Sequence, residues 1–174
     1  MGKILVWDWP VRIGHWLLAG AFALAWLTGD SEEWRLVHAY AGGTVVGVIL
    51  FRLIWGLVGT YHARFTSFVR GPGGVLGYLR GLLAGRPAHT AGHNPAGGAM
   101  IVLLLAMLTA TAVTGHMMTT DAYWGARWVE KLHETLAHGT LALAGLHVLG
   151  VAISGLLHHE NLVKAMWTGR KRAP

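Results

Sequence analysis

The chain alternates long apolar stretches with short polar segments, and this alternation is its strongest structural signal. The apolar stretches cover residues 12–29, 37–59, 96–118 and 134–157. Each is close to the ~20 residues that an α-helix needs to cross a bilayer. The pattern predicts an all-α membrane protein, a bundle of four transmembrane helices in which residues 1–174 form a single domain.

The polar segments predict where helices begin and what lies between them. Asn94 and Pro95 suit the N-cap and the first position of the third helix, because asparagine accepts a hydrogen bond there and proline lacks an N–H that would stay unsatisfied. The segment 60–95 mixes leucine and aromatic residues with spaced arginines. Part of this segment is expected to form an amphipathic helix on the membrane surface.

Basic residues are distributed unevenly between the two predicted sides of the membrane. Four spans place both termini and segment 60–95 on one side, and residues 30–36 and 119–133 on the other. The first side carries Lys3, Arg12, Arg64, Arg70, Arg80, Arg86, Lys164, Arg170, Lys171 and Arg172. The second side carries three basic and five acidic residues. This bias predicts cytoplasmic termini in a bacterial inner membrane, and it explains the net charge of +6 without a nucleic-acid partner.

Composition narrows the possible chemistry. Only 13% of the residues are charged, about half the roughly 25% that is usual in soluble proteins. The chain has no cysteine, so a metal site must use histidine, methionine or carboxylate ligands. Its 25 glycines allow helix backbones to approach one another, or leave room for the face of a flat cofactor.

Two of the apolar stretches carry a histidine near the same polar end. His38 lies three residues after Arg35 in the second stretch, and His133 lies two residues after Lys131, immediately before the fourth. Because both helices enter the membrane from the same side, the two imidazoles are expected at the same shallow depth. Ionisable residues inside spans are costly, which makes both of them functional candidates.

A second pair of histidines is expected deeper in the membrane. His15 lies fifteen residues before Asp30, which is about 22 Å at the helical rise of 1.5 Å per residue. His147 lies sixteen residues after Lys131, about 24 Å below that surface. Two level-matched pairs on different helices have the arrangement required for trans-axial ligation of two haem irons. The fourteen residues between His133 and His147 would separate the irons by about 20 Å.

Other polar residues in or near the spans leave alternatives open. Arg52, fourteen residues after His38, could pair with a haem propionate or extend to the cytoplasmic headgroups. His116 is a rival ligand for the shallow iron, and His93 is a rival for the deep one. Any single histidine could instead hydrogen-bond a neighbouring helix, and His138, on a different helix face, is expected to do so.

Several motifs carry a family resemblance that covers nearly the whole chain. They read "RIGHWLL", "VHAYAGG", "GHNPAGG", "LHETLA", "GLHVLGV" and "HHENLVKAMWTGRKR". In this order they resemble the prokaryotic cytochrome b561 family, and most closely its branch related to nickel–iron hydrogenase cytochrome b subunits. The resemblance implies a four-helix membrane protein with two b-type haems that moves electrons between quinol and a partner. The resemblance places the haem ligands at His15, His38, His133 and His147. These are also the four residues that were paired above by their expected depth in the membrane.

The expected function is therefore electron transfer between the quinone pool, as ubiquinone or menaquinone, and a partner redox protein such as a c-type cytochrome. The alternatives are a superoxide:quinone oxidoreductase acting at the periplasmic haem and a cytochrome b subunit of a hydrogenase. A membrane anchor or transporter with histidine proton relays fits four level-matched histidines less well. Candidate residues for cofactor or quinone contacts are Arg12, Arg52, Arg64 and His93 on the cytoplasmic side, and Tyr123 and Trp124 on the periplasmic side.

Overall fold

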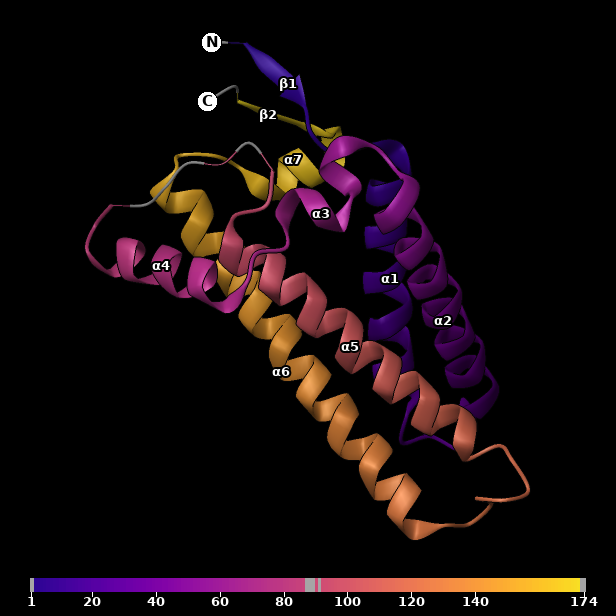
Figure 1. Ribbon diagram of the computed structural model, residues 1–174. Coiled ribbons are helices and arrows are strands. Elements are labelled where there is room, and N and C mark those ends of the chain that lie inside the picture. Colours follow the sequence, from indigo (N-terminus) through magenta and orange to yellow (C-terminus); the bar gives the residue numbers. More distant parts are fainter. Residues whose placement is uncertain (1, 87–89, 91, 173–174) are drawn as a thin grey trace. The chain divides into compact units, whose positions relative to one another are not determined.

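The four predicted spans are four long helices in the computed structural model, which describes residues 2–86, 90 and 92–172. All four are long and apolar enough to cross a membrane. They are α1 (Trp9–Thr28), α2 (Arg35–Val58), α5 (Pro95–Met117) and α6 (Arg127–Leu157), labelled in Figure 1. The prediction of an all-α membrane bundle is confirmed.

Two helix starts show how the sequence sets the boundaries. Helix α5 begins at Pro95 as predicted, and the Asn94 side chain accepts a hydrogen bond from the backbone N–H of Gly97 at 2.7 Å. Helix α6 begins at Arg127, before the predicted start at residue 134, because charged residues in its first turns interrupt the hydropathy pattern. Gly125 precedes it with a φ of +71°, a left-handed conformation that glycine adopts without steric cost.

The segments between and beyond the long helices hold shorter elements. The segment predicted as loop 60–95 contains helical turns, including one helix of twelve residues where part of the segment was expected to be helical; residues 87–89 and 91 of that segment lie outside the described residues. The shorter elements are β1 (Lys3–Leu5), η1 (Tyr61–Ala63), α3 (Phe65–Phe68), α4 (Pro72–Leu83), α7 (Leu162–Thr168) and β2 (Arg170–Arg172).

The chain divides into two compact units, and each long helix contributes one end to each of them. Unit 1 comprises Met1–Arg12, Leu53–Leu103 and Gly145–Pro174. Unit 2 comprises Ile13–Arg52 and Leu104–Ala144. All ten basic residues assigned above to the cytoplasmic side belong to unit 1.

In unit 1 the two ends of the chain pair with each other, which the sequence analysis did not predict. Strands β1 and β2 are antiparallel, with Leu5 opposite Arg170 (Figure 1). Gly169 ends α7 with a φ of +77°, and its carbonyl accepts the N–H groups of Val6 at 2.8 Å and Trp7 at 3.0 Å. Val6, Trp7 and Ala165 are buried together beneath this pairing.

Asp8 links the start of α1 to the end of α2 by hydrogen bonds. One carboxylate oxygen accepts the backbone N–H of Val11 at 2.9 Å, which is an N-cap interaction. The other accepts hydrogen bonds from the indole N–H of Trp55 at 2.9 Å and the hydroxyl of Thr60 at 2.7 Å. A single carboxylate therefore accepts hydrogen bonds from three donors in two segments of unit 1.

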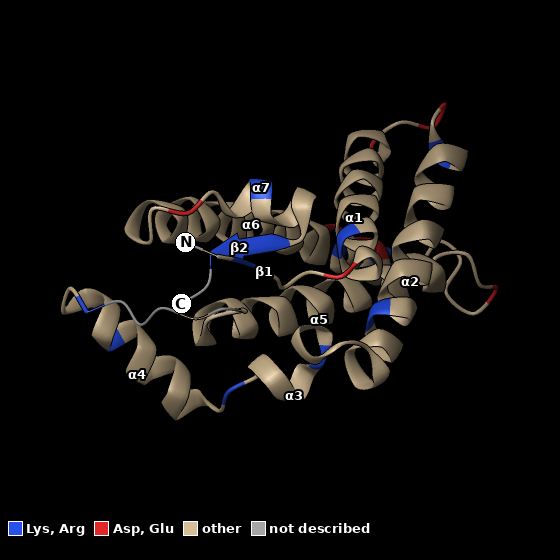
Figure 2. Cartoon of the chain, turned by 90° about the horizontal axis from the view of Figure 1, so that it is seen from above, with Lys and Arg blue, Asp and Glu red and all other residues tan. Residues whose placement is uncertain are grey.

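A buried ion pair holds the C-terminal strand in unit 1. The Lys171 ammonium lies 3.4 Å from the Glu160 carboxylate, and the two side chains are only 7% and 8% exposed. Lys171 also donates to the carbonyl of Thr90 at 3.3 Å, and the backbone N–H of Arg172 donates to Glu160 at 2.9 Å. The other basic residues of this unit include those on α4, α7 and β2 that Figure 2 shows in blue.

Candidate haem-ligand site

Unit 2 brings His38 of α2 and His133 of α6 together. Their ring centroids are 6.1 Å apart, and the ring planes are inclined at 79°. Both side chains are half-buried, although they lie 95 positions apart in the sequence. Both residues lie a few positions after the charged residue at the start of their helix, so residue counting places them at one depth. The packing of unit 2 makes them neighbours. Their role as haem ligands stays a prediction.

Hydrogen bonds to backbone carbonyls fix the tautomer of both rings. Nδ1 of His38 lies 2.8 Å from the carbonyl oxygen of Ala25, and Nδ1 of His133 lies 2.9 Å from that of Thr111. A carbonyl can only accept, so each Nδ1 carries the proton and donates it. In a neutral imidazole the Nε2 atom then holds the lone pair, and it is the atom that can bind a metal. Donation of the second ring N–H to a carbonyl is also typical of metal-bound histidine.

The two rings are close enough to be candidate ligands of one metal, with centroids 6.1 Å apart and an edge contact between the ring planes. Among the described residues no three His, Asp or Glu side chains gather as a metal site. A pair of imidazoles suits haem, because the porphyrin supplies the other ligands.

Helix α5 supplies further contacts to His133. The buried Thr114 hydroxyl oxygen lies 3.2 Å from Nδ1 of His133. That hydroxyl also lies 3.0 Å from the carbonyl of Ala110 and 2.9 Å from that of Thr111, so its own proton is donated to the backbone. The oxygen is left as a second acceptor for the His133 N–H. Thr114 is therefore a positioning residue for this ring.

Two glycines leave room beside these rings. A Cβ atom added at Gly115 would lie 3.0 Å from Cε1 of His133, closer than ordinary van der Waals contact. A Cβ atom added at Gly29 would meet Cε1 of His38 at 3.7 Å, an ordinary contact. Gly115 is thus the position at which a larger residue would press on the imidazole. Small residues have this use in membrane helices, where they allow close approach.

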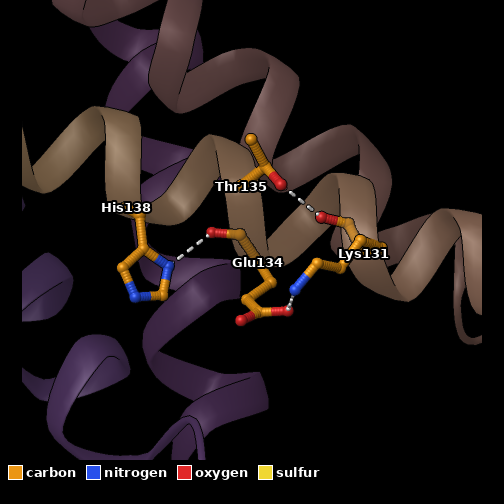
Figure 3. Close-up of polar contacts among 4 residues, drawn as sticks. All are labelled: Lys131, Glu134, Thr135 and His138. Carbon is orange, nitrogen blue, oxygen red and sulfur yellow. Dashed lines mark hydrogen bonds and ion pairs between the residues drawn. The ribbon is translucent and has the colours of Figure 1, made fainter.

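His138 lies on another face of α6, as expected. Its Nδ1 donates to the carbonyl of Glu134 at 2.8 Å, and its ring meets the edge of Trp26 with centroids 4.9 Å apart. Figure 3 shows the hydrogen bond from His138 to Glu134 beside the 2.9 Å ion pair between Lys131 and Glu134 and the hydrogen bond from the Thr135 hydroxyl to the Lys131 carbonyl. His138 is exposed, whereas His133 is half-buried.

The remaining predicted ligands lie on separate parts of the fold. His15 belongs to unit 2, where its ring meets the edge of Trp16 with centroids 5.1 Å apart. His147 belongs to unit 1 and is half-buried on α6. The rival ligand His116 has an exposed side chain on α5. Arg52 is half-buried on α2.

The candidate quinone residues of unit 1 have aromatic neighbours that the sequence analysis did not foresee. The Arg12 guanidinium lies over the Trp9 ring at 4.3 Å, and its Nε donates to the Met166 carbonyl at 3.3 Å. His93 packs between two rings, with centroid separations of 4.3 Å from Trp7 and 4.7 Å from Phe68.

The other candidate quinone residues are exposed. Arg64 is exposed between η1 and α3 in unit 1. On unit 2, Tyr123 and Trp124 are exposed in the turn between α5 and α6.

Comparison with known proteins identifies the family of the chain. The family model described as prokaryotic cytochrome b561 matches residues 6–169. The chain is 27% identical over 143 residues to the probable Ni/Fe-hydrogenase 1 B-type cytochrome subunit of Escherichia coli strain K12 and to its counterpart in strain O157:H7. Each match covers 67% of this chain and 60% of the relative, so the chain spans about three fifths of their length.

No solved structure matches the chain. The family match extends over nearly all of it and includes both histidines of the ligand pair. The chain belongs to the prokaryotic cytochrome b561 family, whose members are membrane electron-transfer proteins with b-type haem.

Proposed function

We propose that the protein holds two b-type haems and passes electrons between the quinone pool and a partner redox protein. The observation that carries this proposal is the His38–His133 pair, with both Nδ1 atoms committed to backbone carbonyls and ring centroids 6.1 Å apart. When bound, haem supplies reversible one-electron chemistry that no side chain of this chain can provide. The two imidazoles would hold the iron, and the carbonyls of Ala25 and Thr111 would keep each ring in its ligating tautomer.

The second haem rests on His15 and His147. His147 lies fourteen residues after His133 on α6, and His15 lies fifteen residues before Asp30, so that residue counting would give the two histidines one depth. Arg52 lies fourteen residues after His38 on α2 and would reach the same level by the same count. A guanidinium at that depth needs an anionic partner, and a haem propionate would be one. Helix α6 would then contact both cofactors.

The charge distribution supports a polarity for this arrangement. Unit 1 holds ten basic residues and only two acidic ones, Asp8 and Glu160. Under the positive-inside rule its chain ends would face the cytoplasm of a bacterial inner membrane, with the His38–His133 pair near the periplasmic surface. The quinone would be ubiquinone or menaquinone.

The surface near His38 and His133 favours a cationic partner over superoxide. Residues 30–35 and 121–134 hold six acidic and three basic residues. The acidic side chains that form ion pairs here are exposed, by 94% at Glu32 and 54% at Glu134. Such a surface repels an anion and attracts a basic protein such as a c-type cytochrome. A superoxide:quinone oxidoreductase is therefore the weaker alternative.

A hydrogenase cytochrome b subunit is a second candidate function. It is supported by the names of the two relatives, which are probable hydrogenase B-type cytochrome subunits. Purification in mild detergent separates the candidates: a hydrogenase role requires a stable complex with a metal-containing hydrogenase, whereas a role with a soluble carrier requires only transient association.

Haem stoichiometry tests the proposed function directly. We expect about two protohaems per chain in the pyridine haemochrome assay of protein made in a haem-replete host, because the sequence supplies two pairs of candidate ligands. Reduction of both by added quinol, and their oxidation by a basic c-type cytochrome, is the expected activity. A preparation with one haem per chain would exclude the second site, and a haem-free preparation would exclude the function.

Thr114 provides a finer test of the ligand pair. In Thr114→Val the His133 N–H loses one acceptor, so the imidazole becomes a poorer donor to iron and the midpoint potential of that haem is expected to rise. One net hydrogen bond contributes a free energy of about 1 kcal/mol. The expected rise in midpoint potential is therefore about 40 mV for one electron. The measurement is a redox titration followed by visible absorption.

Thr109→Val is the matched control for this titration. The Thr109 hydroxyl donates only to the Leu105 carbonyl of its own helix at 2.7 Å, so its removal is expected to leave both potentials unchanged. Thr114→Ser should restore the wild-type value because serine keeps the hydroxyl oxygen. Equal shifts in Thr114→Val and Thr109→Val would show that Thr114 has no specific role.

A further inference from the structure

Helix α4 is amphipathic and too short to cross a membrane. Its twelve residues extend about 18 Å, against a hydrocarbon core of about 30 Å. At 100° per residue, every aliphatic and aromatic side chain falls on one side of the helix. The opposite side consists of glycines and Arg80.

The apolar side of α4 is only partly covered by the protein. Val75, Tyr78 and Leu82 are half-buried, and burial raises the pKa of the Tyr78 hydroxyl above its ordinary value. The adjoining stripe is open: Leu76 is 48% exposed, Leu79 39% and Leu83 89%. These three leucines form the exposed stripe, with the i, i+3, i+7 spacing of one helix face.

Positive charge surrounds this stripe without compensation. Arg70 and Arg86 flank α4, Arg80 lies on it, and all three are exposed. The sequence has no Asp or Glu between residues 34 and 120. The two acidic residues of unit 1 are engaged elsewhere, because Asp8 accepts from Trp55 and Thr60 and Glu160 pairs with Lys171. An anionic surface is therefore the complementary partner.

The position of α4 in unit 1 fits such a surface. The helix lies between the end of α2 at Val58 and the start of α5 at Pro95, where two spans leave the membrane. Figure 1 shows α4 running crosswise to the ends of α5 and α6 that belong to the same unit. A helix lying in the plane of an interface has this orientation.

We propose that α4 is a surface anchor that binds the anionic lipid headgroups of the leaflet next to unit 1. The leucines of the exposed stripe enter the boundary between headgroups and acyl chains, and Arg70, Arg80 and Arg86 contact lipid phosphates. The glycine side faces water. Juxtamembrane arginines are attracted to anionic leaflets in this way.

Site-directed spin labelling tests the proposal on the 174-residue chain purified with its bound haem. The chain has no cysteine, so Leu76→Cys, Leu79→Cys and Leu83→Cys each carry a single label. Gly73→Cys and Gly77→Cys are matched controls from the opposite side, where an added Cβ meets nothing within 4 Å. Accessibility to oxygen and to a water-soluble nickel chelate is measured in nanodiscs of phosphatidylcholine, with and without phosphatidylglycerol.

We expect the ratio of oxygen to nickel accessibility to be several-fold higher at the stripe positions than at the two glycine positions. The contrast should increase with phosphatidylglycerol, and this increase should disappear in a variant with Arg70→Gln, Arg80→Gln and Arg86→Gln. Haem absorption, measured in parallel, monitors folding independently of the proposed electron-transfer role.

Three outcomes would overturn the proposal. Equal nickel accessibility at all five positions would place α4 in water. Stripe labels inaccessible to both reagents would mean that a protein surface, not lipid, covers the leucines. A contrast unaffected by phosphatidylglycerol would exclude recognition of anionic headgroups.

Discussion

Replacing either His38 or His133 by alanine is expected to lower the haem content from about two per chain to about one. A b-type haem is held without covalent bonds to the chain, so loss of an axial ligand removes most of its attachment. The two variants should lose the same haem, because the centroids of the two rings are 6.1 Å apart. The readouts are the pyridine haemochrome assay and the low-temperature absorption spectrum, in which the same component should be missing from both variants.

His138→Ala is the matched control on the same helix. His138 lies five residues after His133 and bonds only within its own turn and to Trp26 among its described contacts. Its removal should leave both haems in place. In His147→Ala the other spectral component should be lost, so that combining His147→Ala with His133→Ala gives a haem-free protein. Retention of two low-spin haems in both His38→Ala and His133→Ala would show that this pair does not bind iron.

Replacing Lys171 by alanine is expected to release the paired chain ends of unit 1. The substitution leaves the Glu160 carboxylate buried without its cation, and breaking a buried pair in this way costs about 3–5 kcal/mol. The amides of Val6 and Trp7, which donate to the Gly169 carbonyl, report the opening. Hydrogen exchange at these amides should accelerate on the order of a hundredfold or more, since each 1.4 kcal/mol is a factor of ten.

Arg172→Ala separates this effect from a general loss of charge. Arg172 neighbours Lys171 on β2, but its side chain is exposed, and its contact with Glu160 is made by the backbone N–H, which alanine keeps. Exchange at Val6 and Trp7 should therefore change little. Similar acceleration in both variants would mean that overall charge, not the buried pair, holds the strand.

The four long helices could be predicted from sequence because the bilayer imposes a length and a hydropathy that each of them carries locally. The start of α5 at Pro95 was also readable, since Asn94 and Pro95 are a local capping signal. The pairing of β1 with β2 was not. Its residues are too few to show an alternating pattern, and the partner of Leu5 lies at Arg170.

The candidate site could also be predicted only in part: the positions of the histidines could be predicted, and their hydrogen-bond acceptors could not. Depth along a helix follows from counting residues, which is why His38 and His133 could be matched from their distances to Arg35 and Lys131. Their supporting acceptors could not be foreseen. The carbonyls of Ala25 and Thr111 belong to the backbone, and backbone groups carry no side-chain signal in the sequence.

The long-range contacts of unit 1 could not be predicted from the sequence either. The sequence alone does not indicate that Asp8 caps α1 through one oxygen and accepts hydrogen bonds from Trp55 and Thr60 through the other. His93 could be read only as a rival ligand, whereas its ring lies between those of Trp7 and Phe68. Such contacts depend on how the helices are joined in space, which residue spacing within one helix does not encode.

The pairing of β1 with β2 also orders events during biosynthesis. Leu5 emerges from the ribosome early, but its partner Arg170 is translated 165 residues later. During that interval α1, α2 and α5 are already available for insertion into the bilayer, while Val6 and Trp7 lack the carbonyl of Gly169 that accepts their amides. The pairing of β1 with β2 can therefore form only after Arg170 has been translated, later than the synthesis of α1, α2 and α5.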